Sequence, residues 1–517
     1  MRKEPWSARA RFPDCPAVNE RRAEGEGPPA AVPEIVGRHR RLVRRTVLVS
    51  GLTLVSRVLG FVREVISAML FGDRSGIYDA FITAWRVPNL FRRFLGEGAI
   101  STSLQTALTE VDGTHGNAAG RALFLRTIGL LTLILLGVCA VVMAGVAVLP
   151  DTMPGTGWRW LGADPGAVRE LCLRLMPFVV LICLAALCGG ALQVRGHFAA
   201  PAVAPAVMNL VWIGVLVAVG GIFGWRALAE RQAEEARSLE MARFLAWGVL
   251  AAGVVQLAVL VPALFSKGLL PTGSESGEVG ASRRLGRTAW DVLKTSAPLA
   301  LGAAVYQINV MVDGLMAEGL LADGGPSAHY YANRIQQFPL ALIAVAATSS
   351  VFPSLKALGH LGRRSELRAL HDRTQYAVCF LALPASVGLF LLAQPMCQVL
   401  FQHGEYGPEG VGRMARALAM LALALLPAGA VGLLSRTYYA LGDFRTPVRV
   451  SASMLALNAL LNLALVAGLG MDADGLALAT ALTSWGNLVL LWPGLRGRLG
   501  LPAAEAGGAG RLSLIHI

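Results

Sequence analysis

Apolar residues are gathered into twelve segments of this chain, separated by shorter polar stretches that hold many of the charged residues. A helix needs about 20 predominantly apolar residues to cross a bilayer, and each segment approaches or exceeds that length. The predicted spans are residues 46–70, 78–105, 124–149, 168–192, 202–223, 243–265, 291–318, 328–352, 374–393, 411–438, 448–469 and 474–493. The pattern predicts an all-α polytopic membrane protein.

The composition agrees with this fold class. Hydrophobic residues make up 55% of the chain, charged residues only 15%, and the mean hydropathy is +0.56. A soluble domain carries about 25% charged residues. The seven cysteines are scattered without CxxC spacing or a Cys/His cluster, so the sequence indicates neither a disulfide framework nor a zinc motif.

The net charge of +13 is best explained by membrane topology. Basic residues outnumber acidic ones in the first 45 residues and in the loops after the sixth, eighth, tenth and twelfth spans. The loops on the opposite side are neutral or acidic wherever they are charged enough to judge. Because Lys and Arg concentrate on the cytoplasmic side, we predict that both ends are cytoplasmic and that no nucleic acid is bound.

Weak internal repeats divide the spans into two halves. The pattern Gly-x-Phe-x-x-Pro at 196–201 recurs at 442–447, 246 residues later, and related motifs beginning at Tyr78 and Tyr331 recur at a similar offset. Transporters built from such repeats bind substrate where the halves meet. We predict a disordered basic tail (1–45), an N-lobe (46–265), a cytoplasmic linker (266–290), a C-lobe (291–495) and a C-terminal tail (496–517). The two six-helix lobes would surround a central cationic cavity.

Charged residues within the predicted spans indicate where such a cavity lies. Arg57, Arg63 and Glu64 fall in the first span and Arg334 in the eighth, and one arginine at a helix centre costs roughly 2.5–3.5 kcal/mol in lipid. Arg57 and Glu64 share a helix face, while Arg63 lies about 120° away. Either the cavity wraps around the helix or Gly60 breaks it. Guanidinium groups match phosphate oxygens bidentately, which favours an anionic ligand; a purely structural ionic network is the alternative.

A second candidate site lies in the second half. Asp313 in the seventh span, with Asn458 and Asn462 one turn apart in the eleventh, offers oxygen ligands for a cation, although such asparagines also simply bridge helices. No Ser/His/Asp, HExxH, P-loop or paired-carboxylate pattern is present. The sequence therefore indicates neither an enzyme nor ATP use.

Three motifs in the charged spans are specific enough to indicate a family. They are Ser-Arg-Val-Leu-Gly-Phe-Val-Arg-Glu at 56–64, Val-Pro-Asn-Leu-Phe-Arg-Arg at 87–93 and Tyr-Tyr-Ala-Asn-Arg at 330–334. With them, residues 46–495 resemble the MurJ (MviN) family of lipid II flippases, in the multidrug/oligosaccharidyl-lipid/polysaccharide exporter superfamily. The resemblance implies a monomer in the bacterial inner membrane, in contact with membrane lipids. It would move the undecaprenyl-diphosphate-linked peptidoglycan precursor, lipid II, outward by alternating access.

The resemblance also implies roles for individual residues. Those at matching positions are Arg57, Arg63 and Arg334 as cavity cations, Glu64 beside them, Ala68 as a small cavity-wall residue, and Asp79, Arg92, Arg93 and Glu97 as functionally sensitive residues. A sodium site would involve Asp313, Asn458 and Asn462, but Asn462 replaces an acid found in some members. The family normally has fourteen spans. The ending 512–517 can be encoded by a transposon end used in sequencing adapters, so we expect the natural C-terminus to be missing.

Other functions stay open at this stage. A sibling exporter of O-antigen units or drugs has the same architecture, although drug antiporters rely more on acidic sites. A membrane-embedded transferase would need catalytic carboxylates or a metal motif in a loop, and a scaffold would leave the buried charges without a use. The energy source would be the membrane potential, an ion gradient such as sodium, or consumption of the product.

Overall fold

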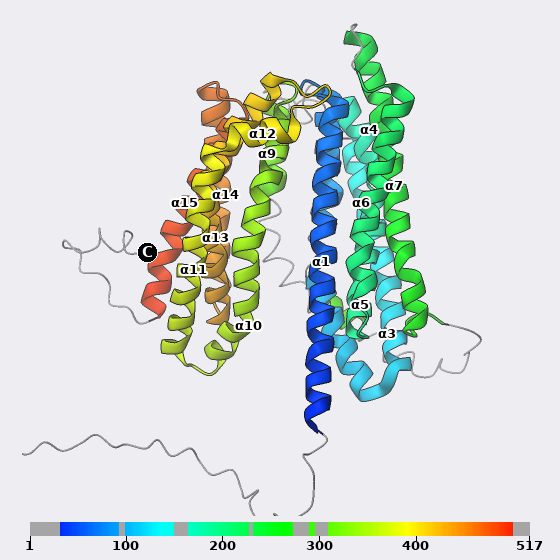
Figure 1. Cartoon of the computed structure of the whole chain (residues 1–517), viewed down its shortest axis with the longest axis vertical. Helices are drawn as coiled ribbons and strands as arrows, with labels where there is room; N and C mark the ends of the chain where they lie inside the picture. The colour runs from blue at the N-terminus through cyan, green and yellow to red at the C-terminus, as the bar shows by residue number, and fades with distance from the viewer. Residues whose placement is uncertain are drawn as a thin grey trace, which may run out of the picture. The chain divides into compact units, whose positions relative to one another are not determined.

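The computed structural model is helical throughout the residues it describes, which are 31–92, 99–148, 164–226, 231–271, 289–294 and 309–499 (Figure 1). No strand occurs in these ranges. The chain divides into two compact units, Met1–Ser50 and Gly51–Ile517, and all contacts described below lie within the second. The predicted all-α fold is therefore confirmed, whereas the predicted boundary between lobes near residue 265 stays a prediction.

The first half contains seven described helices. They are α1 (Ala31–Phe71), α2 (Gly76–Phe91), α3 (Ala99–Val148), α4 (Pro165–Leu175), α5 (Phe178–Val194), α6 (Ala199–Phe223) and α7 (Arg231–Ser266). α1 begins at Ala31, so residues 31–45 are helical and the prediction that they belong to a disordered tail is wrong. Leucine and arginine are good helix formers, and a helix nucleated in the apolar segment extends through them at little cost. α3 is kinked at Gly116, whose φ of 81° is accessible to glycine at no steric cost.

The second half begins, among the described residues, with helical stretches at 289–294 and 309–320. The following elements are α9 (Gly325–Leu340), the π-helical turn η3 (Ala341–Val345), α10 (Ala346–His360), α11 (Arg364–Leu391), α12 (Ala393–Phe401), α13 (Pro408–Ala440), α14 (Arg445–Asn462), the π-helical turn η4 (Leu463–Gly468) and α15 (Ala473–Arg498). α13 packs against α9, α11 and α15 and forms the centre of this half.

The turn between α13 and α14 is held by Asp443. Its Oδ1 accepts hydrogen bonds from the backbone N–H groups of Arg445 and Thr446, each at 3.0 Å, and so satisfies donors that the start of α14 would otherwise leave unpaired. Its other oxygen pairs with Arg498 at the end of α15. Partial burial alone would raise the pKa of Asp443, but the hydrogen bonds from Thr446 and the charge of Arg498 outweigh burial and lower it.

Eight helical segments in the described residues are long and apolar enough to cross a membrane. They are 100–148, 165–194, 199–223, 232–266, 364–391, 408–440, 445–468 and 473–498. These match the predicted third to sixth and ninth to twelfth spans. The other four predicted spans are not among these eight segments. The first, second and eighth carry Glu64, Asp79 and Arg334, and the seventh lies partly outside the described residues. The total of twelve spans stays a prediction.

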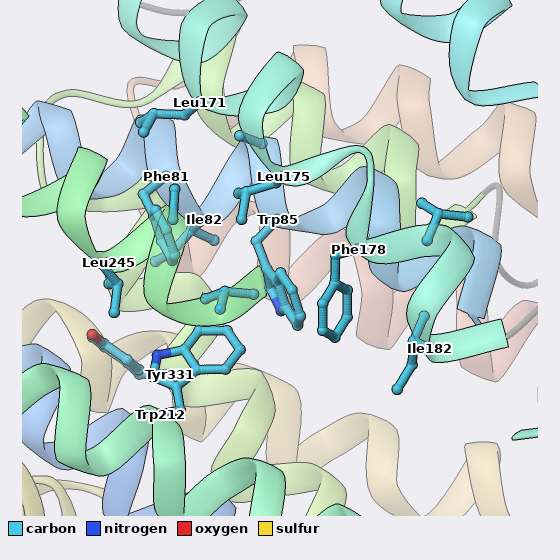
Figure 2. Packing of buried hydrophobic residues seen from close by; sticks show 14 of the residues in the cluster. Phe81, Ile82, Trp85, Leu171, Leu175, Phe178, Ile182, Trp212, Leu245 and Tyr331 are labelled. Carbon is cyan, nitrogen blue, oxygen red and sulfur yellow. The ribbon is translucent and has the colours of Figure 1, made fainter. Parts of the chain in front are cut away.

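Aromatic packing fixes α2 against α5 and α6. Figure 2 shows Trp85 with Trp212 on one side and Phe178 on the other. The Trp85 and Trp212 rings meet edge to face with centroids 4.8 Å apart, and Trp85 and Phe178 are 5.1 Å apart. Leu171 and Leu175 of α4 belong to the same buried cluster. Because aromatic pairs have preferred geometries, this cluster sets the position of the Trp212 ring, which contacts Arg63 of α1.

Candidate functional site

A cavity of about 1400 Å³ opens among α1, α2, α5, α6, α9, α10, α11, α12 and α13. Its charged lining residues are Arg57, Arg63, Glu64, Arg92, Arg334 and Arg436. Cations therefore outnumber the one acid in the lining by five to one. α1 runs without a break from Ala31 to Phe71, so the cavity wraps around this helix and the alternative of a break at Gly60 is wrong.

α6 passes close to the cavity face of α1 at Gly60. A Cβ atom at this position would lie 3.4 Å from Nδ2 of Asn209, an ordinary van der Waals contact. Asn209 donates to the backbone oxygen of Ser56 at 3.0 Å and accepts from Nη1 of Arg63 at 3.1 Å. The guanidinium of Arg63 also lies over the Trp212 ring, 4.2 Å from its centroid. α6 therefore holds Arg63 on two sides, through an amide and a cation–π contact.

Glu64 is the point where the two halves of the charged cluster meet. Its Oε1 is 2.5 Å from Nη2 of Arg63 and 3.3 Å from Nη2 of Arg334, and it accepts the hydroxyl hydrogen of Tyr330 at 3.0 Å. The Glu64 side chain is only 5% exposed, whereas that of Arg334 is 31% exposed. One buried carboxylate thus serves two guanidinium groups and cannot neutralise both.

Arg57 completes the predicted cation trio in a different environment. It is exposed, lines the cavity, and has no ion-pair partner among the described residues. The structure thus shows an ionic network around Glu64, while the binding site stays a prediction. Arg63 and Arg334 are paired, yet they line the cavity together with unpaired Arg57. This arrangement presents excess positive charge, with forked donors, to whatever enters.

The remaining residues implied by the resemblance lie in different places. Ala68 is fully buried in the core and is not among the cavity-lining residues. It therefore does not occupy the cavity-wall position that the resemblance implied. Arg92 does line the cavity, and its Nε and Nη2 donate to Oδ1 of Asn89 at 3.2 and 3.0 Å. Arg93 and Glu97 lie outside the described residues.

Asp79 connects α2 to the start of α9. Its carboxylate accepts the backbone N–H of Gly324 at 2.5 Å and that of Ser327 at 2.8 Å. It therefore supplies the cap that the first turn of α9 needs, and its charge complements the positive end of that helix. Nearby, the hydroxyl of Thr83 donates to Glu318 at 2.7 Å, a second buried contact between α2 and the second half.

Hydrogen bonds join the C-terminal end of α1 to the residues that precede and begin α13. The N–H of Glu405 donates to the backbone oxygen of Met69 at 3.1 Å, and the N–H of Gly410 donates to Oδ2 of Asp73 at 2.8 Å. Gly404, with a φ of 59°, lies against the same Met69 oxygen. None of these residues lines the cavity, so the cavity stops short of this end.

The second candidate site is a hydrogen-bonded cluster. Nδ2 of Asn462 donates to Oδ1 of Asp313 at 3.0 Å and to Oδ1 of Asn458 at 3.2 Å. Hard cations take oxygen ligands, but Asn462 turns its amide nitrogen towards both neighbours. The predicted residues come together as expected. In this amide orientation Oδ1 of Asn462 has no hydrogen-bond partner among the described residues, and the sodium site stays a prediction.

Two parts of the site were not predicted from the sequence. Asn209 and Trp212 of α6 hold Arg63, and the only sequence signal was a polar residue within an apolar span. Arg436 lines the cavity and donates to the hydroxyl of Thr348 in α10. Because Arg436 lies two residues before the predicted end of the tenth span, it resembles an ordinary interfacial arginine in the sequence.

Comparison with known proteins identifies the family of this chain. The family model "Lipid II flippase MurJ" matches residues 67–510. "Lipid II flippase MurJ" of Burkholderia cenocepacia is 32% identical over 461 residues, which cover 88% of this chain and 84% of the relative. "Probable lipid II flippase MurJ" of Vibrio cholerae is 31% identical over 471 residues, covering 88% and 83%.

Solved structures show the same fold. "Lipid II flippase MurJ, inward closed conformation" matches with a TM-score of 0.68 at 20% identity and covers 87% of both chains. An inward-facing multidrug resistance MATE family transporter of the MOP superfamily matches with a TM-score of 0.62 at 12% identity, over 88% of this chain and 98% of that one. With the eight apolar helices, these findings identify a multi-pass membrane protein. The chain therefore belongs to the lipid II flippase MurJ family.

Proposed function

We propose that this protein moves lipid II, the undecaprenyl-diphosphate-linked peptidoglycan precursor, from the cytoplasmic to the outer leaflet of the bacterial inner membrane. The observation that carries this proposal is the cluster of Arg57, Arg63 and Arg334 in one cavity, with Glu64 as the single acid. A diphosphate offers several oxygens to forked guanidinium donors. The protein would act as a monomeric transporter and not as an enzyme.

The contacts at one end of the cavity support alternating access. If the N-terminus is cytoplasmic, as the loop charges predict, the contacts of Asp79 with α9 and of residues 403–410 with Met69 and Asp73 lie on the outer side. They would hold the cavity shut to that side. Release of the substrate would require these contacts to break, because the cavity does not reach past them.

The membrane potential is a sufficient energy source. A diphosphate carries roughly two negative charges, and an inside-negative potential favours their exit by about 2.3 kcal/mol per charge per 100 mV, so roughly 4–5 kcal/mol in total. A tenfold shift in population needs only about 1.4 kcal/mol. The proposal includes no cofactor and assigns no step to sodium, because the potential alone supplies enough free energy.

Complementation of a bacterium depleted of its own flippase tests this function. Arg63→Ala and Arg334→Ala should fail to restore growth and should leave lipid II inaccessible at the outer surface. The corresponding lysine variants should retain at most part of the activity, because the forked geometry is lost.

Arg416→Ala is the matched control, since Arg416 is exposed on α13 and does not line the cavity. Membrane levels of every variant are compared by immunoblot. Full activity of both alanine variants at normal levels would refute a diphosphate-binding role. Restored export of another lipid-linked glycan, without lipid II, would favour a sibling exporter of the same superfamily.

A further inference from the structure

We infer that Arg436 forms a second anion-binding subsite in the cavity, which takes a carboxylate of the substrate's peptide while the cluster around Glu64 takes the diphosphate. This inference rests on the proposed function, because it concerns another part of the same substrate. Arg436 is a cavity-lining cation that belongs to neither the predicted trio nor the contacts around Glu64.

The distance between the two subsites follows from the helices. Gln336 of α9 donates to the backbone oxygen of Leu421 at 3.3 Å, so these residues lie at the same level of the bundle, half a turn from Arg334. Arg436 follows Leu421 by 15 residues along α13, which is roughly 22 Å at 1.5 Å per residue. Along α9 and α10, Gln336 and Thr348 are 12 residues apart, or roughly 18 Å. Both routes place Arg436 about 20 Å from the level of Arg334.

The surroundings of Arg436 leave its charge uncompensated. Its Nη1 donates to the hydroxyl of Thr348, which is neutral, and no carboxylate pairs with it among the described residues. The side chain is partly buried, and Ser435 and Tyr439 line the cavity beside it. A guanidinium that is partly buried beside neutral polar groups favours an incoming anion over water more than a fully exposed one does.

The ligand must therefore carry two anionic groups far apart. A peptide of six residues spans at most about 20–22 Å when extended, which matches the distance between the subsites, and the sugar unit adds to the reach of a shorter peptide. A peptidoglycan precursor carries its diphosphate at one end of the sugar unit and a carboxylate-bearing peptide on the other side. A lipid diphosphate without such a peptide would reach only the cluster around Glu64. Arg436 would thus contribute to selection of the complete precursor.

The test measures binding of two synthetic ligands to the purified full-length protein. Both ligands are the peptidoglycan precursor carried on a short, water-soluble lipid. The first ligand has free peptide carboxylates, and in the second ligand these carboxylates are converted to carboxamides. Dissociation constants are measured for the unmodified protein and for Arg436→Gln, Arg334→Ala and Arg416→Gln. Arg416→Gln removes the same charge from an exposed site on the same helix.

We expect Arg436→Gln to weaken binding of the carboxylate ligand roughly tenfold or more, the effect of losing a hydrogen bond between charged groups. The same change should leave binding of the carboxamide ligand unaltered, and Arg416→Gln should alter neither. Arg334→Ala should weaken both ligands, because both retain the diphosphate.

An equal loss for both ligands in Arg436→Gln would overturn the inference and reduce Arg436 to a structural link between α13 and α10. No loss for either ligand would overturn it as well. In both cases the proposed function stands if Arg334→Ala still weakens binding. If Arg334→Ala binds both ligands normally, the diphosphate site itself is wrong, and the second subsite falls with it.

Discussion

Replacing Glu64 by Gln should destabilise this protein more than its small change in shape suggests. The substitution keeps an acceptor oxygen but removes the charge, so the guanidinium groups of Arg63 and Arg334 would face each other without a counter-ion. Removing one partner of a buried ion pair costs about 3–5 kcal/mol. Arg63 keeps its contacts with Asn209 and Trp212, and Arg334 is partly solvated, so we expect a loss near the lower limit, about 3 kcal/mol.

The assay is thermal unfolding of the detergent-solubilised protein, followed by the fraction that stays monodisperse after heating. The midpoint should fall by several degrees for Glu64→Gln. Glu409→Gln is the matched control, because Glu409 also pairs with an arginine far away in sequence, Arg74, but both side chains are more than 70% exposed. An exposed pair contributes little, so this variant should unfold like the parent. Equal midpoints for the two variants would refute the role of Glu64 as the shared counter-ion.

Three further predictions concern other parts of the molecule. Asp79→Ala should remove the cap of α9, lower stability by about 1–2 kcal/mol, and raise labelling of a cysteine placed at Ser327 by an outside reagent; unchanged labelling would contradict the closure described above. Asp443 has a lowered pKa in the folded state, so its contribution is present above its unfolded pKa and is lost as the pH falls through its folded value. Stability measured from pH 6 to pH 3 should therefore fall more for the parent than for Asp443→Asn. Dissipating the membrane potential at constant sodium should stall flipping, whereas exchanging sodium for potassium at constant potential should change little; the opposite pair of results would favour sodium coupling.

The charged residues of α1 show what local sequence can establish. Arg57, Arg63 and Glu64 stand out because ionic groups are costly inside a membrane, and that cost is a property of each residue alone. Their place in the cavity was therefore predictable. The alternative of a break at Gly60 could not be decided from the sequence, because the surroundings of this glycine include a helix that begins 139 residues later.

The partners of these residues depend on packing between distant helices. Asn209 reaches Arg63 only because α6 crosses α1 at Gly60. Arg436 lies near a span end, where arginines commonly reach the membrane surface, and only the course of α13 turns it into the cavity. The burial of Ala68 and the orientation of the Asn462 amide also depend on packing and were not predictable from the sequence. Ala68 is a small apolar residue like many others, and the orientation of Asn462 depends on which neighbours its amide meets.

The contacts of residues 403–410 with the C-terminal end of α1 restrict how this segment of the sequence can vary. Backbone groups of Glu405, Gly410 and Met69 make these hydrogen bonds, and Asp73 supplies the one side chain involved. Exchanging side chains in the loop leaves those groups in place, whereas inserting or deleting one residue moves each of them out of register. A Cβ atom at Gly404 would lie 2.6 Å from the Met69 oxygen, and one at Gly410 would collide with Asp73. The exposed side chains of this segment can therefore vary during evolution, while its length, Gly404, Gly410 and the buried Tyr406 stay constant.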